Sequence, residues 1–151
     1  MPELMIRNSI HVNAPASTLW RVLTENQFIP QYMFGCTAET DWRPGSPLLW
    51  KGVADGKLYV KGHVVATQPP MRLEYTVIDP NNPEIPDVPE NYLTVAYLLS
   101  RSGNGCTLEI TQGDFAKVAK GESRYRESQD PNNTILVAIK KLAEEEAKAR
   151  R

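Results

Sequence analysis

The sequence predicts an α+β fold in which a curved antiparallel sheet of about seven strands wraps around one long C-terminal helix. Residues 134–148 carry apolar side chains at three- and four-residue steps, the period of a helix with one buried stripe, and the stripe consists of Ile135, Ile139, Leu142 and Ala143. Most segments before this helix instead alternate apolar and polar residues or are rich in β-branched and aromatic residues, as strands are. Because one apolar stripe needs one surface to cover, we expect the strands to form a single sheet against the helix.

The N-terminal elements are expected to be one strand and two short helices. Residues 4–13 alternate apolar with polar side chains, which predicts a strand with one buried face. A short helix follows with Pro15 in its first turn, and a second is expected at 28–33, where Pro30 limits its length. The two helices are expected to close one end of the sheet.

Between Phe34 and Asp114, runs of Val, Thr, Tyr and Leu are punctuated by turn-forming dipeptides, which predicts a series of strands. Their expected ranges are 35–42, 47–53, 57–67, 71–79, 91–101 and 105–114. The dipeptide Asp55-Gly56 is typical of a type I′ turn and predicts a hairpin. Sequential hairpins make a meander, so the expected element order is β-α-α-β-β-β-β-β-β-α.

The connection at 79–91 differs from the others because Pro80, Pro83, Pro86 and Pro89 recur every third residue among acidic side chains. This period matches the polyproline II helix, so the prolines are expected to share one edge of an extended loop. A mobile lid or docking strip and a stiff, solvated connection between strands are both compatible with this pattern.

Composition narrows the class of protein. The chain has 17 Lys and Arg residues against 18 Asp and Glu residues, a net charge of −1, so we expect no nucleic-acid partner. No apolar run approaches the roughly 20 residues of a membrane span, and the first residues lack signal-peptide features. We therefore expect one domain over residues 1–151, located in the cytoplasm, with no stable insertion into a membrane.

The two cysteines and two histidines do not form a metal-binding pattern. Cys36 and Cys106 lie in expected strands, and in a cytoplasmic chain they are expected to be free, buried thiols. Neither a Cys-x-x-Cys nor a His-x-x-x-His spacing is present. We therefore expect no metal site and no cofactor.

Five stretches resemble a known family: IHVNAPASTLWRVLT (10–24), TDWRPGSPLLWKG (40–52), PPMRLEY (69–75), NYLTVAYLL (91–99) and TLEITQG (107–113). Together they resemble the START-like (SRPBCC) superfamily and, within it, the domain similar to the activator of heat-shock-protein-90 ATPase. The resemblance implies a helix-grip fold with a deep hydrophobic cavity between the concave face of the sheet and the long helix. It also implies a lipid or another apolar molecule as ligand.

The final helical region departs from this family. Relatives commonly carry a tryptophan near its middle, where this chain has residues 130–133. Pro131 is expected to end or kink any helix that begins at 122–127, because proline cannot continue the hydrogen-bond ladder. The mouth of the implied cavity is therefore expected to differ in shape at this point.

Alternation along the strands, together with the stripe on the last helix, selects the side chains that face the implied cavity. The predicted ligand-binding residues are Trp50, Val64, Leu73, Tyr75, Val95, Tyr97, Leu108, Ile110, Gln112, Ile135 and Ile139. Most are large and apolar, which suits a small apolar or amphipathic molecule. The same residues are equally compatible with a core that has no cavity.

Gln112 is the predicted polar anchor of this set. It is in line with Leu108 and Ile110, and a buried glutamine without partners is costly. We therefore expect Gln112 to meet a ligand, a water or a backbone group. Asn8, in line with apolar residues of the first strand, raises the same question with less force because it lies nearer a strand end.

Two other functions are compatible with the resemblance. Cyclases and hydrolases occur on related folds, but the inward-facing set offers only two tyrosines as titratable groups, and no catalytic residue is assigned. Asp41 and Asp114 lie near strand ends, where a turn or solvated role is favoured. The chaperone-linked branch of the family also raises the possibility of a protein partner or a homodimer, which an exposed apolar patch would favour.

Overall fold

The computed structural model describes residues 3–149, and within them seven strands form one antiparallel sheet in the order β1-β7-β6-β5-β4-β3-β2. The strands are β1 (Ile6–Val12), β2 (Cys36–Glu39), β3 (Pro47–Gly52), β4 (Leu58–Gln68), β5 (Arg72–Val77), β6 (Leu93–Ser102) and β7 (Gly105–Gly113). The helices are α1 (Ala16–Thr24), α2 (Ile29–Tyr32), α3 (Gly121–Glu127) and α4 (Thr134–Ala149), with short 3₁₀ turns at Pro89–Asn91 and Phe115–Lys117. The expected fold class is confirmed, and the expected elements follow one another in the expected order, with α3 as one further helix.

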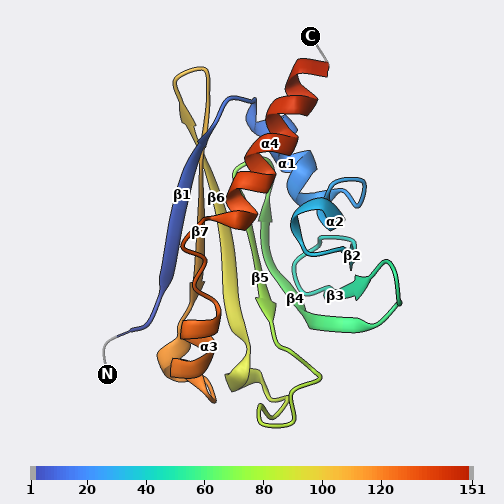
Figure 1. Cartoon of the computed structure of the whole chain (residues 1–151), viewed down its shortest axis with the longest axis vertical. Coiled ribbons are helices and arrows are strands. Elements are labelled where there is room, and N and C mark those ends of the chain that lie inside the picture. The colour runs from blue at the N-terminus through green and yellow to red at the C-terminus, as the bar shows by residue number, and fades with distance from the viewer. Residues whose placement is uncertain (1–2, 150–151) are drawn as a thin grey trace.

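The sheet curves around the helices. Figure 1 shows α4 in front of the upper part of the sheet, α1 and α2 to the right of α4, and α3 at the opposite end of the molecule. β1 pairs over its full length with residues 106–112 of β7, and Cys106 on β7 is the partner of Val12 on β1. None of the described helices is long and apolar enough to cross a membrane.

α4 follows the predicted stripe with one shift. Ile139 and Ala143 are fully buried, as is Leu136, which lies outside the predicted stripe. Ile135 is half-buried, because α4 packs mainly against α1 and β1 and not over the middle of the sheet. The Asp130 carboxylate caps the helix, accepting a hydrogen bond from the backbone N–H of Ile135 at 3.3 Å.

α3 is a helix additional to the predicted order, and it covers the lower end of the concave face. Its Tyr125 ring meets the Phe115 ring edge-on, with centroids 5.5 Å apart. Phe115 is buried against Ile6 and Leu93, which gives this end a small apolar cluster of its own. α3 ends before Pro131, in agreement with the expected effect of that proline.

The connection at 79–91 does not form the expected polyproline II edge. Turns interrupt it, a 3₁₀ turn spans Pro89–Asn91, and the side chain of its own Ile85 is buried. The Asn91 side chain donates to the Pro86 carbonyl at 2.9 Å and accepts from the Ala119 backbone N–H at 2.9 Å. The second of these bonds ties the loop to the segment just before α3. The proline spacing did not predict this shape, because it carries no information about long-range partners.

Candidate functional site

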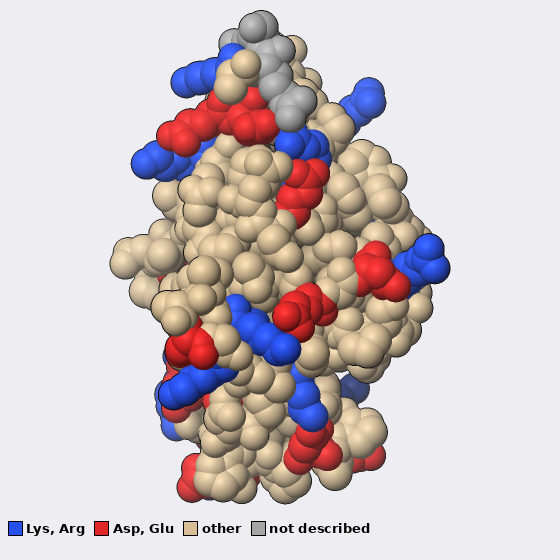
Figure 2. Space-filling view, turned by 90° about the vertical axis from the view of Figure 1, so that its right-hand side faces the viewer, with Lys and Arg blue, Asp and Glu red and all other residues tan. Residues whose placement is uncertain are grey.

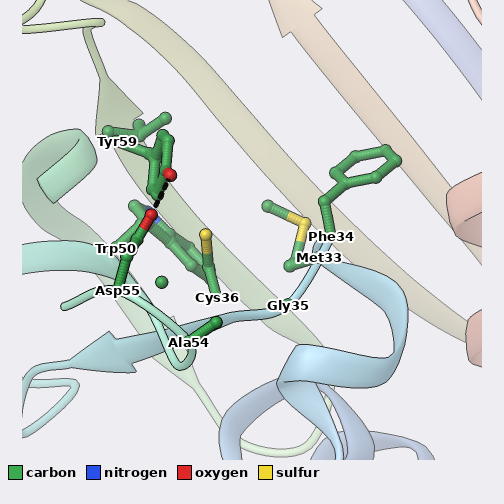
Figure 3. Close-up of a pocket in the computed structure, with 10 residues that line it drawn as sticks. Met33, Phe34, Gly35, Cys36, Trp50, Ala54, Asp55 and Tyr59 are labelled. Carbon is green, nitrogen blue, oxygen red and sulfur yellow. Dashed lines mark hydrogen bonds between the residues drawn. The ribbon is translucent and has the colours of Figure 1, made fainter. Parts of the chain in front are cut away.

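A cavity of about 570 Å³ lies at the curled end of the sheet, between the α2–β2 connection and the β3–β4 hairpin. Its walls are Met33, Phe34, Gly35, Cys36, Trp50, Gly52, Ala54, Asp55, Tyr59 and Val60. Figure 3 shows these side chains coming from both the connection and the hairpin. Carbon and sulfur atoms make up most of this surface, so the cavity is suited to an apolar molecule.

The α2–β2 connection turns sharply because two consecutive residues have positive φ angles, 53° at Phe34 and 78° at Gly35. The Gly35 N–H donates to the Pro30 carbonyl at 3.0 Å, and its own carbonyl accepts from the Val53 N–H at 2.9 Å. This geometry leaves the Phe34 ring 79% exposed at the cavity. The Val53 side chain, on the hairpin that the same bond ties down, is 66% exposed.

The β3–β4 hairpin forms the opposite wall and corrects the predicted turn type. A type I′ turn needs positive φ at both central residues, but here Gly56 has φ of 70° and Asp55 does not have positive φ. The Gly56 N–H instead reaches the Gly52 carbonyl at 2.8 Å. The Asp55 carboxylate accepts from the Lys57 backbone N–H at 3.0 Å and from the Tyr59 hydroxyl.

Trp50 joins the cavity to the protein core. Its side chain is only 2% exposed, and its ring lies 5.6 Å from that of Tyr75, centroid to centroid. Among the side chains that the structure describes, its indole nitrogen is the one buried nitrogen or oxygen without a hydrogen-bond partner. An unpaired buried donor of this kind calls for an acceptor, because most buried polar groups in proteins have one.

The Asp55 carboxylate and the Cys36 thiol in the wall have pKa values that are shifted away from neutral pH. The Tyr59 hydroxyl and the Lys57 backbone amide lower the pKa of Asp55, so this carboxylate is charged at neutral pH. Burial and the nearby Asp55 charge raise the pKa of the Cys36 thiol, which disfavours the nucleophilic thiolate. The site thus has neither a base poised near neutral pH nor an activated nucleophile in its walls.

The tyrosines behind Trp50 are also held neutral. Tyr75 lies 6.4 Å from Tyr97 between ring centroids, and burial raises the pKa of Tyr97 to about 12. Burial likewise raises the pKa of Tyr75 well above its usual value. The Tyr32 hydroxyl donates to the Leu23 carbonyl at 2.9 Å. These hydroxyls act as hydrogen-bonding groups of the core at neutral pH.

The predicted ligand-binding residues divide between the cavity wall and the core. Trp50 lines the cavity. The structure brings together in one buried cluster Val64, Leu73, Tyr75, Val95, Tyr97, Leu108, Ile110 and Ile139. Ile135 packs against this cluster, and Gln112 is half-buried away from the cavity, paired with Ile6 of β1 and Val95 of β6. The predicted set is therefore contiguous around Tyr75 but meets the cavity at one residue.

The family description "Activator of Hsp90 ATPase homolog 1-like protein" matches residues 13–144. The chain belongs to this family. The match confirms the family resemblance drawn from the sequence. No curated protein matches the chain.

Solved structures agree with this assignment. Protein ChR145 from Cytophaga hutchinsonii is 33% identical, with coverage of 98% of this chain and 99% of that protein and a TM-score of 0.75. Protein MLL2253 from Mesorhizobium loti is 18% identical, covers 93% and 97%, and has a TM-score of 0.74. The Aha1 dimer from Colwellia psychrerythraea is 13% identical, covers 93% and 96%, and has a TM-score of 0.69. The last two show the fold alone.

Several residues of the cavity wall were not predicted from the sequence. Val60 was recoverable, because it is in line with Val64 along β4. No sequence pattern indicated that Phe34 and Cys36 line a cavity, because their positions depend on the positive φ angles of Phe34 and Gly35. Asp55 was recognised only as a turn residue.

Asp41 and Asp114 have the local roles favoured by the sequence. Asp41 accepts from the Arg43 N–H at 2.9 Å, and Asp114 accepts from the N–H groups of Leu4 and Ala116, each at 2.9 Å. Both carboxylates therefore stabilise turns near strand ends, away from the cavity walls.

Proposed function

We propose that this protein binds a small, mainly apolar or amphipathic molecule in the cavity beside Trp50. The observation that carries the proposal is the cavity itself, whose volume of about 570 Å³ falls within the range of roughly 300–1,000 Å³ typical of small-molecule sites. Met33, Trp50 and Val60 supply apolar contact area, and Asp55 and Tyr59 lie in the same wall. The remaining predicted residues take part where a longer ligand reaches past Trp50 toward Tyr75.

Native mass spectrometry of freshly purified protein, followed by solvent extraction, tests this proposal. We expect an apolar molecule at near-stoichiometric occupancy. The variant Ala54→Trp adds a large side chain at an exposed position of the wall and is expected to lower the occupancy. Its matched control is Val53→Trp, because Val53 is the adjacent exposed residue and does not line the cavity.

The contrary result is an empty protein whose melting temperature is not raised by any member of a panel of lipids and aromatic compounds. A ligand that binds only the folded state must raise that temperature. This outcome would replace ligand binding with the second candidate function.

That second candidate is contact with a protein, including a second copy of this chain. Phe34, Val53 and Tyr59 are 79%, 66% and 43% exposed, and the Gly35–Val53 hydrogen bond brings their two segments together. Figure 2 shows an uncharged area on the side of the molecule to which these segments belong. Sedimentation equilibrium of the wild-type protein and of the Val53→Ser variant tests this candidate. We expect the wild-type protein to assemble and the variant to assemble more weakly.

We also propose that residues 1–151 act as one domain in the cytoplasm. The single sheet supports the assignment of one domain, because every described strand belongs to it. The two free cysteines suit a reducing compartment, where disulfides are rare. Cys106 is buried as expected, whereas Cys36 is half-buried because it forms part of the cavity wall. Limited proteolysis that yields one protected fragment over the full length would support the domain assignment.

A further inference from the structure

A second hollow lies on the outer face of the sheet and shares no residue with the cavity beside Trp50. Its volume of about 430 Å³ falls within the range of roughly 300–1,000 Å³ typical of small-molecule sites. Thr76 on β5 and Thr94 on β6 are cross-strand partners, and both line this outer hollow. Because they alternate with the core residues Tyr75 and Val95, their side chains lie on the face of the sheet opposite the core.

Short side chains form the floor of the outer hollow, and the connection between β5 and β6 forms its wall. Gly62 on β4 also lines the hollow, and a Cβ at this position would lie 1.7 Å from the Thr76 carbonyl oxygen. The close approach of β4 to β5 therefore requires glycine. In the wall, the Asp87 carboxylate accepts from the Tyr92 hydroxyl at 2.6 Å and pairs with Lys61 on β4. These two contacts fasten the wall to the sheet.

His63 is held in this hollow with one ring nitrogen unused. The Thr76 hydroxyl accepts from the His63 backbone N–H at 3.1 Å. Its own proton has two acceptors, the ring Nδ1 of His63 at 3.1 Å and the His63 carbonyl at 3.5 Å. Donation to the nearer acceptor leaves the proton of a neutral imidazole on Nε2. Within residues 3–149, no protein group pairs with this Nε2 or with the Thr94 hydroxyl.

The charges around the outer hollow favour a neutral ligand. Lys61 and Asp87 already neutralise each other as an ion pair. An anion would have to compete with Asp87 for Lys61, and a cation would have to compete with Lys61 for Asp87. A neutral molecule leaves this pair intact.

The groups that remain available for hydrogen bonds are of both kinds. The His63 Nε2–H donates, the Asp87 oxygens keep lone pairs that accept, and the Thr94 hydroxyl does both. Hydroxyl groups on a ligand also donate and accept, so a molecule with several of them matches this mixture. The Tyr92 ring and Pro89 line the same hollow and offer apolar area to the C–H groups of such a molecule.

We propose that the outer hollow binds a neutral, polyhydroxylated ring of monosaccharide size. The hydroxyls of this ring bond to His63, Asp87 and Thr94, and its C–H face lies against Tyr92 and Pro89. This binding site is additional to the proposed function, because it uses none of the residues beside Trp50.

Titration followed by the backbone amide resonances of the protein tests the proposal. The probes are the methyl glycosides of glucose, galactose and mannose, together with myo-inositol. We expect at least one of them to shift the amides of His63 and Thr94. Tetrahydropyran, which has the sugar ring without hydroxyls, is expected to cause no shift. The uronate and amino-sugar forms of the tightest glycoside are expected to bind more weakly than the neutral form.

Two matched substitutions and one competitor assign the binding to the outer hollow. Thr94→Val removes a hydroxyl at nearly constant volume and is expected to weaken binding by about threefold to tenfold, the effect of one hydrogen bond. Thr111→Val is the control, because Thr111 lies on the same face of β7 and does not line the hollow. The apolar probe 2-acetylnaphthalene, directed at the cavity beside Trp50, is expected not to displace the glycoside.

The inference is overturned if none of the four polyols shifts these resonances, or if a charged form binds more tightly than the neutral one. Equal effects of Thr94→Val and Thr111→Val, or displacement of the glycoside by 2-acetylnaphthalene, would place the sugar elsewhere and overturn it as well. None of these results affects the proposed function, which is tested by an apolar molecule in the other cavity.

Discussion

The concave face of the sheet has two regions that differ in what covers them. In the core cluster to which α1 and α4 contribute, side chains such as Val64, Leu108 and Ile139 are completely buried. At the curled end, the cover is a short connection whose Phe34 is 79% exposed, and a cavity of about 570 Å³ lies beneath it. A helix with an apolar stripe can fill the concavity of a sheet, whereas a tight turn held by backbone hydrogen bonds leaves it partly open.

This contrast predicts where substitutions destabilise the protein most. Ile139→Ala removes a fully buried side chain from α4 and is expected to lower the free energy of unfolding by about 2–5 kcal/mol. Val137→Ala on the same helix is the matched control, because Val137 is 49% exposed and its truncation is expected to cost less than about 0.5 kcal/mol. Urea unfolding of both variants measures the difference. Equal losses would show that α4 is not packed as described.

The tyrosines between the two regions predict a loss of stability in alkali. Burial raises the pKa of Tyr97 to about 12 in the folded protein, compared with about 10 for an exposed tyrosine. Between these values the folded state binds more protons than the unfolded state, so the free energy of unfolding falls as the pH rises. Two pKa units correspond to about 2.7 kcal/mol for this group.

Urea unfolding at a series of pH values from about 9 to about 12 measures this slope. Tyr97→Phe is expected to make the slope shallower, with a remainder from Tyr75, whose pKa burial raises in the same direction. A free energy of unfolding that is constant over this range would mean that these hydroxyls are open to water.

Phe34 is expected to contribute little to stability and more to binding. Its φ of 53° is unfavourable for phenylalanine and better tolerated by asparagine, so Phe34→Asn is expected to leave the free energy of unfolding unchanged or to raise it by up to about 1 kcal/mol. The same variant loses apolar surface at the cavity and is expected to bind 2-acetylnaphthalene less tightly. A destabilised variant would contradict this expectation and would show that the Phe34 side chain packs into the core.

The fully buried core was predictable from sequence, and the region around the cavity was not. Ile139 follows from helical periodicity, and Tyr75 and Leu108 follow from strand alternation, because both patterns are set by local geometry. The α4 stripe was shifted by one residue to include Leu136, since the packing of the helix against α1 and β1 decides which side is buried.

The cavity depends on features that have no periodic signal. The position of Phe34 follows from a positive φ angle. The Trp50 indole N–H is unpaired because no hydrogen-bond acceptor lies within reach of it. α3 was not predicted because its seven residues contain no fully buried side chain and hence no apolar stripe. The proline spacing at 79–91 was misleading, because the bonds made by Asn91 decide the shape of that loop.

The most direct test of ligand binding beside Trp50 uses the three indole N–H resonances of the protein. On titration with 2-acetylnaphthalene, we expect the Trp50 N–H resonance to shift, because an aromatic ring then lies beside the Trp50 indole in the cavity wall. Trp42, already bonded to the Thr24 carbonyl, and Trp20, which lies outside the cavity wall, serve as internal controls and are expected to move little. An unmoved Trp50 resonance at saturating probe would contradict the account.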